Sequence, residues 1–226
     1  ALPISLVVLL FCFGPHAYEA DLEAVLHAPD NVRREAAALD AREHETGLHS
    51  KRVACHTVVL ARRFSNDPHR LRQVYRGALL HDLGKIGIPD AVLLKSGPLD
   101  EQEWRLMRTH PEIGHRILGA VPFMAEAADI VLSHEERYDG TGYPRGLAGE
   151  AIPLWARLFA VIDALDAMTS DRPYRRGKSF EAAMQIIVDA AGSQFDPLAV
   201  EACVAEQATL RAMVMVKCGN PARSEE

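Results

Sequence analysis

Apolar residues recur through most of this chain at the spacing of an α-helix, and this pattern limits the possible fold more than any other feature. Segments that alternate between apolar and polar residues, as half-buried strands do, are almost absent. Turn signals separate the helical segments, so the main part of the chain is predicted to be all-α. We expect helices near residues 46–64, 70–83, 100–109, 111–119, 122–135, 153–169, 178–191 and 197–212.

Local signals mark several ends of these helices. Asp100 and Glu103 have the spacing of a capping box. Pro111 and Pro153 suit the first position of a helix, and Gly192 suits the position after a helix end. These residues predict boundaries and carry no chemistry.

The length of 226 residues allows one sizeable core but not two full domains. We therefore expect an N-terminal extension over residues 1–37, as a linker helix or a remnant of a longer segment, and a main domain over residues 38–226. The apolar run at residues 1–14 is more typical of a buried strand or a signal-peptide core than of a membrane span. Because the chain opens at alanine, we expect an upstream sensor or receiver domain.

Charge and cysteine usage exclude some classes of function. The formal net charge of -6 argues against a surface for nucleic-acid polymers, which bind basic faces. The 4 cysteines form no Cys-x-x-Cys pair, which argues against a zinc ribbon or a thioredoxin-like centre and fits reduced thiols in the cytoplasm.

Histidines and carboxylates are spaced along the chain as metal ligands could be. His81 and Asp82 end an apolar helical run, and Lys85 follows within one turn. Glu45 and His49 are four residues apart, so both side chains lie on one helix face and can reach one metal ion. A His-Asp pair by itself is weak evidence, and the other positions give it weight.

Asp163 lies within the strongly apolar segment 154–168, where an unpaired carboxylate would cost several kcal/mol. It therefore needs a hydrogen-bond partner or a cation. The resulting candidate ligands are His49, His81, Asp82, His110, His134 and Asp163, with Glu45 and Glu135 as further carboxylates. Nitrogen and oxygen ligands without thiolates suit Fe or Mn, and a bridging Asp82 could hold two ions for displacement at phosphorus.

Six segments, in this order, resemble the HD-GYP family: ETGLHSKRV, HDLGK, THPEIG, SHEERYDGTGYP, VIDALDAMTSDRPYR and GSQFDP. The resemblance runs from about Ala38 to about Ala205. It implies an all-α HD-domain helical bundle with two or three divalent metal ions. The implied activity is hydrolysis of cyclic di-GMP to pGpG, GMP or both in bacterial second-messenger signalling. Diguanylate cyclase (GGDEF) proteins and a second copy of the chain in a homodimer are the macromolecular partners it suggests.

The resemblance also assigns roles to residues. The six candidate ligands match the family's metal ligands, and Glu45 matches the carboxylate of members with a third ion. Lys85 matches the lysine that offsets phosphate charge, and Asp82 with Lys85 would form the catalytic pair. Tyr143, Arg172 and Arg175 match residues that hold the dinucleotide.

This chain departs from the family pattern at Glu135, where similar proteins carry a second histidine after His134. The change motivates a first alternative, a catalytically impaired receptor that binds the dinucleotide and signals to a partner. A second alternative is an HD phosphohydrolase for another nucleotide, including cyclic GMP-AMP.

Several residues have simpler interpretations. We expect His56 to be packed in the core, and Asp166 to form a structural hydrogen bond or salt bridge rather than bind a metal. The loop 139–144 is an ordinary glycine-rich turn by itself, but its place after His134 suggests that it shapes the mouth of a pocket. A partner-docking role for this loop is the other interpretation.

Overall fold

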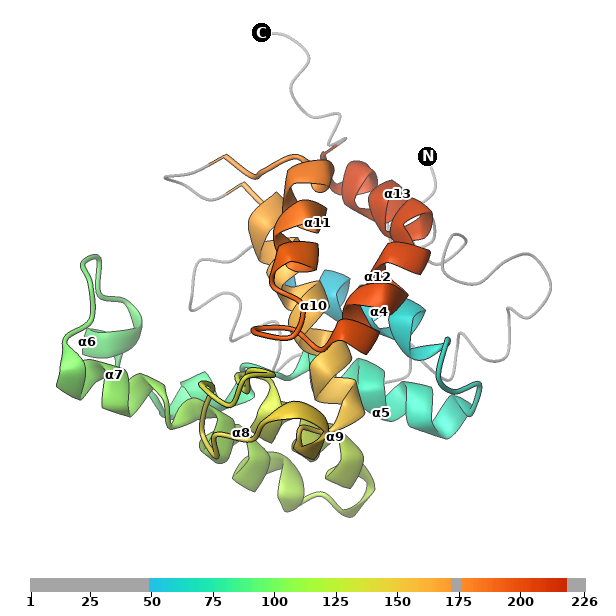
Figure 1. The fold of residues 1–226 in the computed structure, drawn as a ribbon. Helices are drawn as coiled ribbons and strands as arrows, with labels where there is room; N and C mark the ends of the chain where they lie inside the picture. The colour runs from blue at the N-terminus through green and yellow to red at the C-terminus, as the bar shows by residue number, and fades with distance from the viewer. Residues whose placement is uncertain (1–48, 172–175, 219–226) are drawn as a thin grey trace, which may run out of the picture.

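The computed structural model describes residues 49–171 and 176–218, and all regular structure in these two ranges is helical (Figure 1). Two isolated β-bridges are the only strand-like pairings there. The all-α prediction is therefore confirmed. The helices are α4 (His49–Ala61), α5 (Pro68–Leu79), α6 (Asp90–Leu93), α7 (Glu101–Met107), α8 (His110–Gly119), α9 (Ala125–Ser133), α10 (Leu154–Thr169), α11 (Phe180–Asp189), α12 (Pro197–Ala205) and α13 (Gln207–Cys218), with 3-10 turns η1 (Leu83–Gly87), η2 (Pro122–Met124) and η3 (Gly149–Ala151).

Helix α10 is the centre of the bundle and packs against α4, α9, α11 and α12 (Figure 1). Its side chains at 158, 159, 161, 162 and 165 are completely buried. A helix that is apolar on nearly all sides is typical of a core position. Because α4, α5 and α9 pack around the same core, the segments that carry the candidate ligands are brought to one region.

The predicted helix signals agree with the structure within one or two residues. Asp100 and Glu103 form the expected capping box at the start of α7, and Pro111 lies in the first turn of α8. Pro153 is the N-cap of α10, one position earlier than predicted. Gly192 follows the end of α11 with a φ of 78°, a conformation that favours glycine.

The predicted single helix over residues 197–212 is wrong. The chain breaks at Glu206 into α12 and α13. The Glu206 carboxylate lies 2.9 Å from Nη1 of Arg63, just after α4, and the break lets Leu210 and Met213 pack in the core. No glycine or proline marks this position, so the helical pattern alone did not show the break.

The predicted helix over residues 70–83 ends early, at Leu79. His81 and Asp82 lie in the turn between α5 and η1, not within a helix. The four-residue helix α6 was not predicted, because so short a segment has no measurable periodicity.

The extension at residues 1–37 and the apolar run at residues 1–14 lie outside the described residues. Among the helices of residues 49–171 and 176–218, none combines the length and the apolar character needed to cross a lipid bilayer.

Phe159 is the residue whose truncation tests this packing. Its side chain is fully buried, and its ring centroid lies 4.9 Å from that of His81 and 5.9 Å from that of His134. Phe159→Ala should lower the free energy of unfolding by about 3–5 kcal/mol, because it leaves a cavity in the core. Urea denaturation followed by circular dichroism measures this change.

Val188→Ala is the control, since Val188 is 42% exposed on α11 and its truncation should cost less than about 0.5 kcal/mol. Equal losses in the two variants would contradict the central place of Phe159.

Candidate metal centre

Three histidines of the candidate set are oriented in the same way. The Nδ1 atoms of His81, His110 and His134 lie 2.9, 2.8 and 2.7 Å from the backbone oxygen of the residue three positions earlier. Donation from Nδ1–H to a carbonyl places the lone pair of the neutral ring on Nε2. Each ring therefore offers Nε2 as a metal ligand, with its orientation already set.

The positions of these histidines explain the shared geometry. His81 comes two residues after the end of α5, His110 follows the end of α7, and His134 caps the end of α9. Carbonyls in the last turn of a helix lack an intrahelical N–H partner. An imidazole that follows the helix end satisfies one of them and is held by it.

Asp82 lies between these rings. Its Oδ2 is 3.0 Å from Nε2 of His81 and 2.8 Å from Nζ of Lys85. Its Oδ1 is 3.5 Å from Nε2 of His110 and 3.8 Å from Nε2 of His134. Partial burial acts to raise the pKa of Asp82, but the charges of His81 and Lys85 hold it well below its usual value. The ionised carboxylate thus turns one oxygen toward each of two histidine groups.

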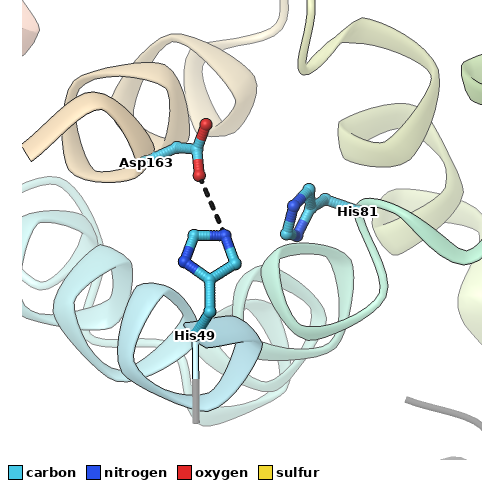
Figure 2. A group of neighbouring side chains, drawn as sticks. All are labelled: His49, His81 and Asp163. Atoms are coloured by element: carbon cyan, nitrogen blue, oxygen red, sulfur yellow. Dashed lines mark ion pairs between the residues drawn. The ribbon is translucent and has the colours of Figure 1, made fainter. Parts of the chain in front are cut away.

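The first group consists of His49, His81 and Asp163. His49 belongs to α4, His81 to the turn that follows α5, and Asp163 to α10. One ligand atom of each lies within 4.8 Å of the others. Figure 2 shows His49 and Asp163 facing each other, with Nε2 and Oδ1 3.3 Å apart, and His81 beside them. Asp163 is partly exposed rather than buried, and His49 is the partner that this carboxylate needs within an apolar helix.

The second group consists of Asp82, His110 and His134. Nε2 of His110 and Nε2 of His134 are only 3.0 Å apart, although each Nδ1 already faces a carbonyl. Burial and the neighbouring His134 lower the pKa of His110 to about 3, and burial also lowers that of His134. Two neutral rings that point lone pairs at each other beside a carboxylate form a donor set that fits a cation.

His49 is held by a second pair of residues. Its Nδ1 lies 2.8 Å from Oδ2 of the buried Asp166, and Arg52 binds the same carboxylate through two nitrogens at 2.8 and 2.9 Å. The structural role expected for Asp166 is therefore confirmed. Burial opposes a charge on His49, but Asp163 and Asp166 together raise its pKa to about 10. A metal at Nε2 has to displace this proton, so acid opposes binding.

Two close backbone approaches complete the site. A Cβ on Gly84 would lie 1.8 Å from the backbone oxygen of His110, so only glycine lets η1 lie this close to α8. A Cβ on Gly142 would lie 2.3 Å from the backbone nitrogen of Arg137. The buried Glu136 accepts hydrogen bonds from two backbone N–H groups of the following loop, which brings Tyr143 within 6.3 Å of His110, ring to ring.

A cavity of about 730 Å³ opens over this centre. This volume is within the usual range for a small-molecule site. Among the residues that line it are Lys85, His110, His134, Glu135, Tyr143 and Asp163.

The structure brings together His49, His81, Asp82, Lys85, His110, His134, Tyr143 and Asp163. Glu135 lies at the edge of the second group, with Oε1 4.0 Å from Nε2 of His110 and 3.9 Å from Nε2 of His134. The remaining predicted residues, Glu45, Arg172 and Arg175, lie outside the described residues. His56 is buried in the core, as expected.

Sequence reasoning did not identify Arg52, Trp104 or Arg108. Arg52 is three residues after His49, and Asp166 is three residues after Asp163. Each therefore lies on the same helix face as a candidate ligand, and a search of these two faces for opposite charges could have found Arg52. Trp104 and Arg108 line the cavity from α7 and its C-cap, and their place six and two residues before His110 is the signal that could have identified them.

Known proteins resemble this chain closely. A family model described as HD domain matches residues 34–198. A cyclic di-GMP phosphodiesterase of Vibrio cholerae is 42% identical, over 75% of this chain and 38% of the relative. The cyclic di-GMP phosphodiesterase response regulator RpfG of Xanthomonas campestris is 40% identical, over 80% of this chain and 48% of the relative.

A third relative, 3'3'-cGAMP-specific phosphodiesterase 3 of Vibrio cholerae, is 38% identical, over 70% of this chain and 35% of the relative. The chain thus spans less than half the length of these three relatives. The crystal structure of a cyclic GMP-AMP specific phosphodiesterase of V. cholerae (V-cGAP3) aligns with a TM-score of 0.63 at 21% identity, over 81% of this chain and 50% of that one. This structural similarity supports the HD-domain fold.

Asp166→Asn tests whether Asp166 positions His49. The variant should bind Mn²⁺ about 10- to 100-fold more weakly, because loss of a carboxylate behind a ligand histidine loosens its orientation and lowers its basicity. Competition with a chelator measures the affinity on protein that circular dichroism shows to be folded. Asp189→Asn, at an exposed position on α11, is the matched control. Equal affinities in the two variants would exclude the positioning role.

Proposed function

The chain belongs to the HD domain family, as its resemblance to HD-GYP proteins predicted, and we propose that it is a metal-dependent phosphodiesterase that hydrolyses cyclic di-GMP to pGpG, GMP or both. One observation carries the proposal: Asp82 turns one oxygen toward His81 of the first group and the other toward His110 and His134, and a cavity large enough for a nucleotide opens over this centre. Adjacent cations that share a carboxylate are suited to phosphoryl chemistry.

We propose that the site holds two divalent ions, with Asp82 between them. One ion would bind His49, His81 and Asp163, and the other His110 and His134. The mixed nitrogen and oxygen donors favour Fe or Mn. Glu135 would be a further ligand of the second ion, and Glu45 would serve a third ion.

When bound, the ions supply Lewis acidity and an activated water for in-line displacement at phosphorus. Lys85 lines the cavity beside Asp82 and offsets the negative charge that develops on the phosphate oxygens. Burial and the carboxylate of Glu135 raise the pKa of Tyr143 well above its usual value, so its hydroxyl stays protonated in the lining of the cavity.

Two alternatives have specific support. Relatives named 3'3'-cGAMP-specific phosphodiesterases are 35–38% identical, which makes cyclic GMP-AMP the competing substrate. Glu135 in place of histidine motivates the receptor alternative, in which the dinucleotide is bound but not cleaved. The Glu135 carboxylate lies beside the second group, 3.9–4.0 Å from Nε2 of His134 and His110, and an acid there can still bind Fe or Mn, which favours the enzyme.

The other expectations from the sequence stay predictions. They are the domain division at residue 38, an upstream sensor or receiver domain, GGDEF-protein partners, a homodimer, and dinucleotide contacts by Arg172 and Arg175.

The proposal predicts metal and turnover together. Protein purified anaerobically with Fe or Mn should contain at least two ions per chain and should consume cyclic di-GMP faster than cyclic GMP-AMP, as followed by chromatography. Asp82→Ala should lose both metal and turnover, because the shared ligand is gone. Asp129→Ala, at an exposed carboxylate on α9, should lose neither.

Each failure has a distinct meaning. Tight binding of cyclic di-GMP without product would replace the enzyme with a receptor, and turnover of the mixed dinucleotide alone would reassign the substrate. Metal retained in Asp82→Ala would show that the ions bind elsewhere.

Lys85→Met should lower kcat for cyclic di-GMP by about 10²–10³-fold, because a preorganised charge at the developing oxyanion is removed. Its metal content, measured by mass spectrometry, should match that of the unchanged protein. Lys51→Met, at an exposed lysine of α4, provides the comparison. An unchanged kcat in Lys85→Met would remove Lys85 from the mechanism.

A further inference from the structure

One wall of the cavity comes from α7, which projects from the bundle (Figure 1). This wall includes Trp104 and the C-cap residue Arg108, and the Arg108 guanidinium approaches Tyr143 of the loop after α9. The Arg108 guanidinium carbon lies 5.8 Å from the Trp104 ring centroid and 5.6 Å from that of Tyr143. A planar cation within cation–π distance of two aromatic rings thus borders the cavity over His110.

The fold does not account for this arrangement. No residue of α7 is buried, and Trp104 is 45% exposed. Within residues 49–171 and 176–218, no carboxylate lies within ion-pair distance of Arg108, whereas Arg105 on the same helix pairs with Glu101. An exposed tryptophan beside an arginine without an ion-pair partner, both in the wall of a cavity, indicates a surface that contacts a ligand.

The chemistry of the two side chains identifies a ligand class. An indole ring stacks on the flat face of a nucleobase. A guanidinium offers paired N–H donors that match O6 and N7 of guanine, whereas adenine presents a donor in place of O6. The pair therefore suits guanine better than adenine or a pyrimidine.

Position connects this pair with the metal centre. Arg108 is two residues before His110, and the Tyr143 ring contacts both residues, 5.6 Å from the Arg108 carbon and 6.3 Å from the His110 ring. A base held at α7 is therefore next to the place where the scissile phosphate would lie.

We propose that Trp104 and Arg108 form a binding site for one guanine base of the cyclic dinucleotide, with Trp104 stacking on the base and Arg108 selecting its O6 and N7 edge. This inference rests on the proposed function, since it needs a guanine dinucleotide as substrate. It adds residues that determine base specificity, a role that the metal ligands do not have.

The kinetic test compares two substrates of the metal-loaded enzyme: cyclic di-GMP, and bis(4-nitrophenyl) phosphate, which has no base. The ratio of kcat/KM for cyclic di-GMP to that for the nitrophenyl ester should fall at least about 10-fold in Trp104→Ala and in Arg108→Ala, as expected for loss of one stacked or bidentate base contact. The fall should come mainly from KM. Arg108→Lys should show much of the loss, because lysine keeps the charge without the paired donors.

Arg105→Ala is the matched control, because Arg105 is next to Trp104 on the same helix but does not line the cavity, and its ratio should stay within about twofold of the unchanged protein. Preference for cyclic di-GMP over cyclic di-AMP should also fall in Arg108→Ala. Unchanged ratios in both test variants, or an equal loss in Arg105→Ala, would overturn the base site.

A binding test is independent of turnover. The chain contains 2 tryptophans, Trp104 and Trp155, and Trp155 is packed against the core. GMP should quench the fluorescence of Trp155→Phe, which keeps only Trp104, and should leave that of Trp104→Phe unchanged. No quenching in Trp155→Phe would contradict the stacking role.

The two proposals fail separately. An unchanged protein that cleaves no cyclic dinucleotide contradicts the proposed function. Normal turnover of cyclic di-GMP with unaltered ratios in the α7 variants contradicts the base site alone.

Discussion

The site depends on one repeated interaction, a hydrogen bond from the Nδ1–H of a histidine to a carbonyl in the last turn of the preceding helix. It fixes the rings of His81, His110 and His134 in the same orientation and turns each Nε2 toward Asp82. Without these bonds the rings could rotate, and the close approach of two Nε2 atoms would be relieved by rotation. A helix end therefore does two things here: it satisfies a backbone acceptor and it aims a ligand.

The bundle keeps these helix ends together. Phe159 of the central helix α10 packs against the rings of His81 and His134, so one core side chain also supports two of the candidate ligands. Gly84 allows the turn with Asp82 and Lys85 to lie against α8. Behind His49, Asp166 and Arg52 form a partly buried ion pair, which has little net value for stability but sets the direction of the imidazole. Folding thus brings together groups that would otherwise repel one another or stay hydrated.

Much of this arrangement could be predicted from the sequence because it depends on local patterns. Helical periodicity predicts the class, and the capping signals locate the start of α7 and α8 closely. Residue type and spacing indicate the described candidate ligands, since His and Asp within apolar segments need partners. The break at Glu206 was not predictable in this way, because it depends on Arg63, which is distant in sequence.

The other omissions have the same cause. Arg52 matters through Asp166, more than a hundred residues away, and Trp104 and Arg108 matter because the fold sets them in the cavity wall, with Arg108 beside the ring of Tyr143. Such relations arise from tertiary packing, which periodicity does not encode. The pair of oxygens that Asp82 presents to two groups is likewise visible only in three dimensions.

Anomalous X-ray diffraction from crystals grown with Mn²⁺ tests the central claim most directly. The account predicts two adjacent anomalous peaks, one among His49, His81 and Asp163 and one among Asp82, His110 and His134, with Asp82 between them. Crystals of manganese-saturated protein with no peak at either group, or with peaks only elsewhere on the chain, would contradict it.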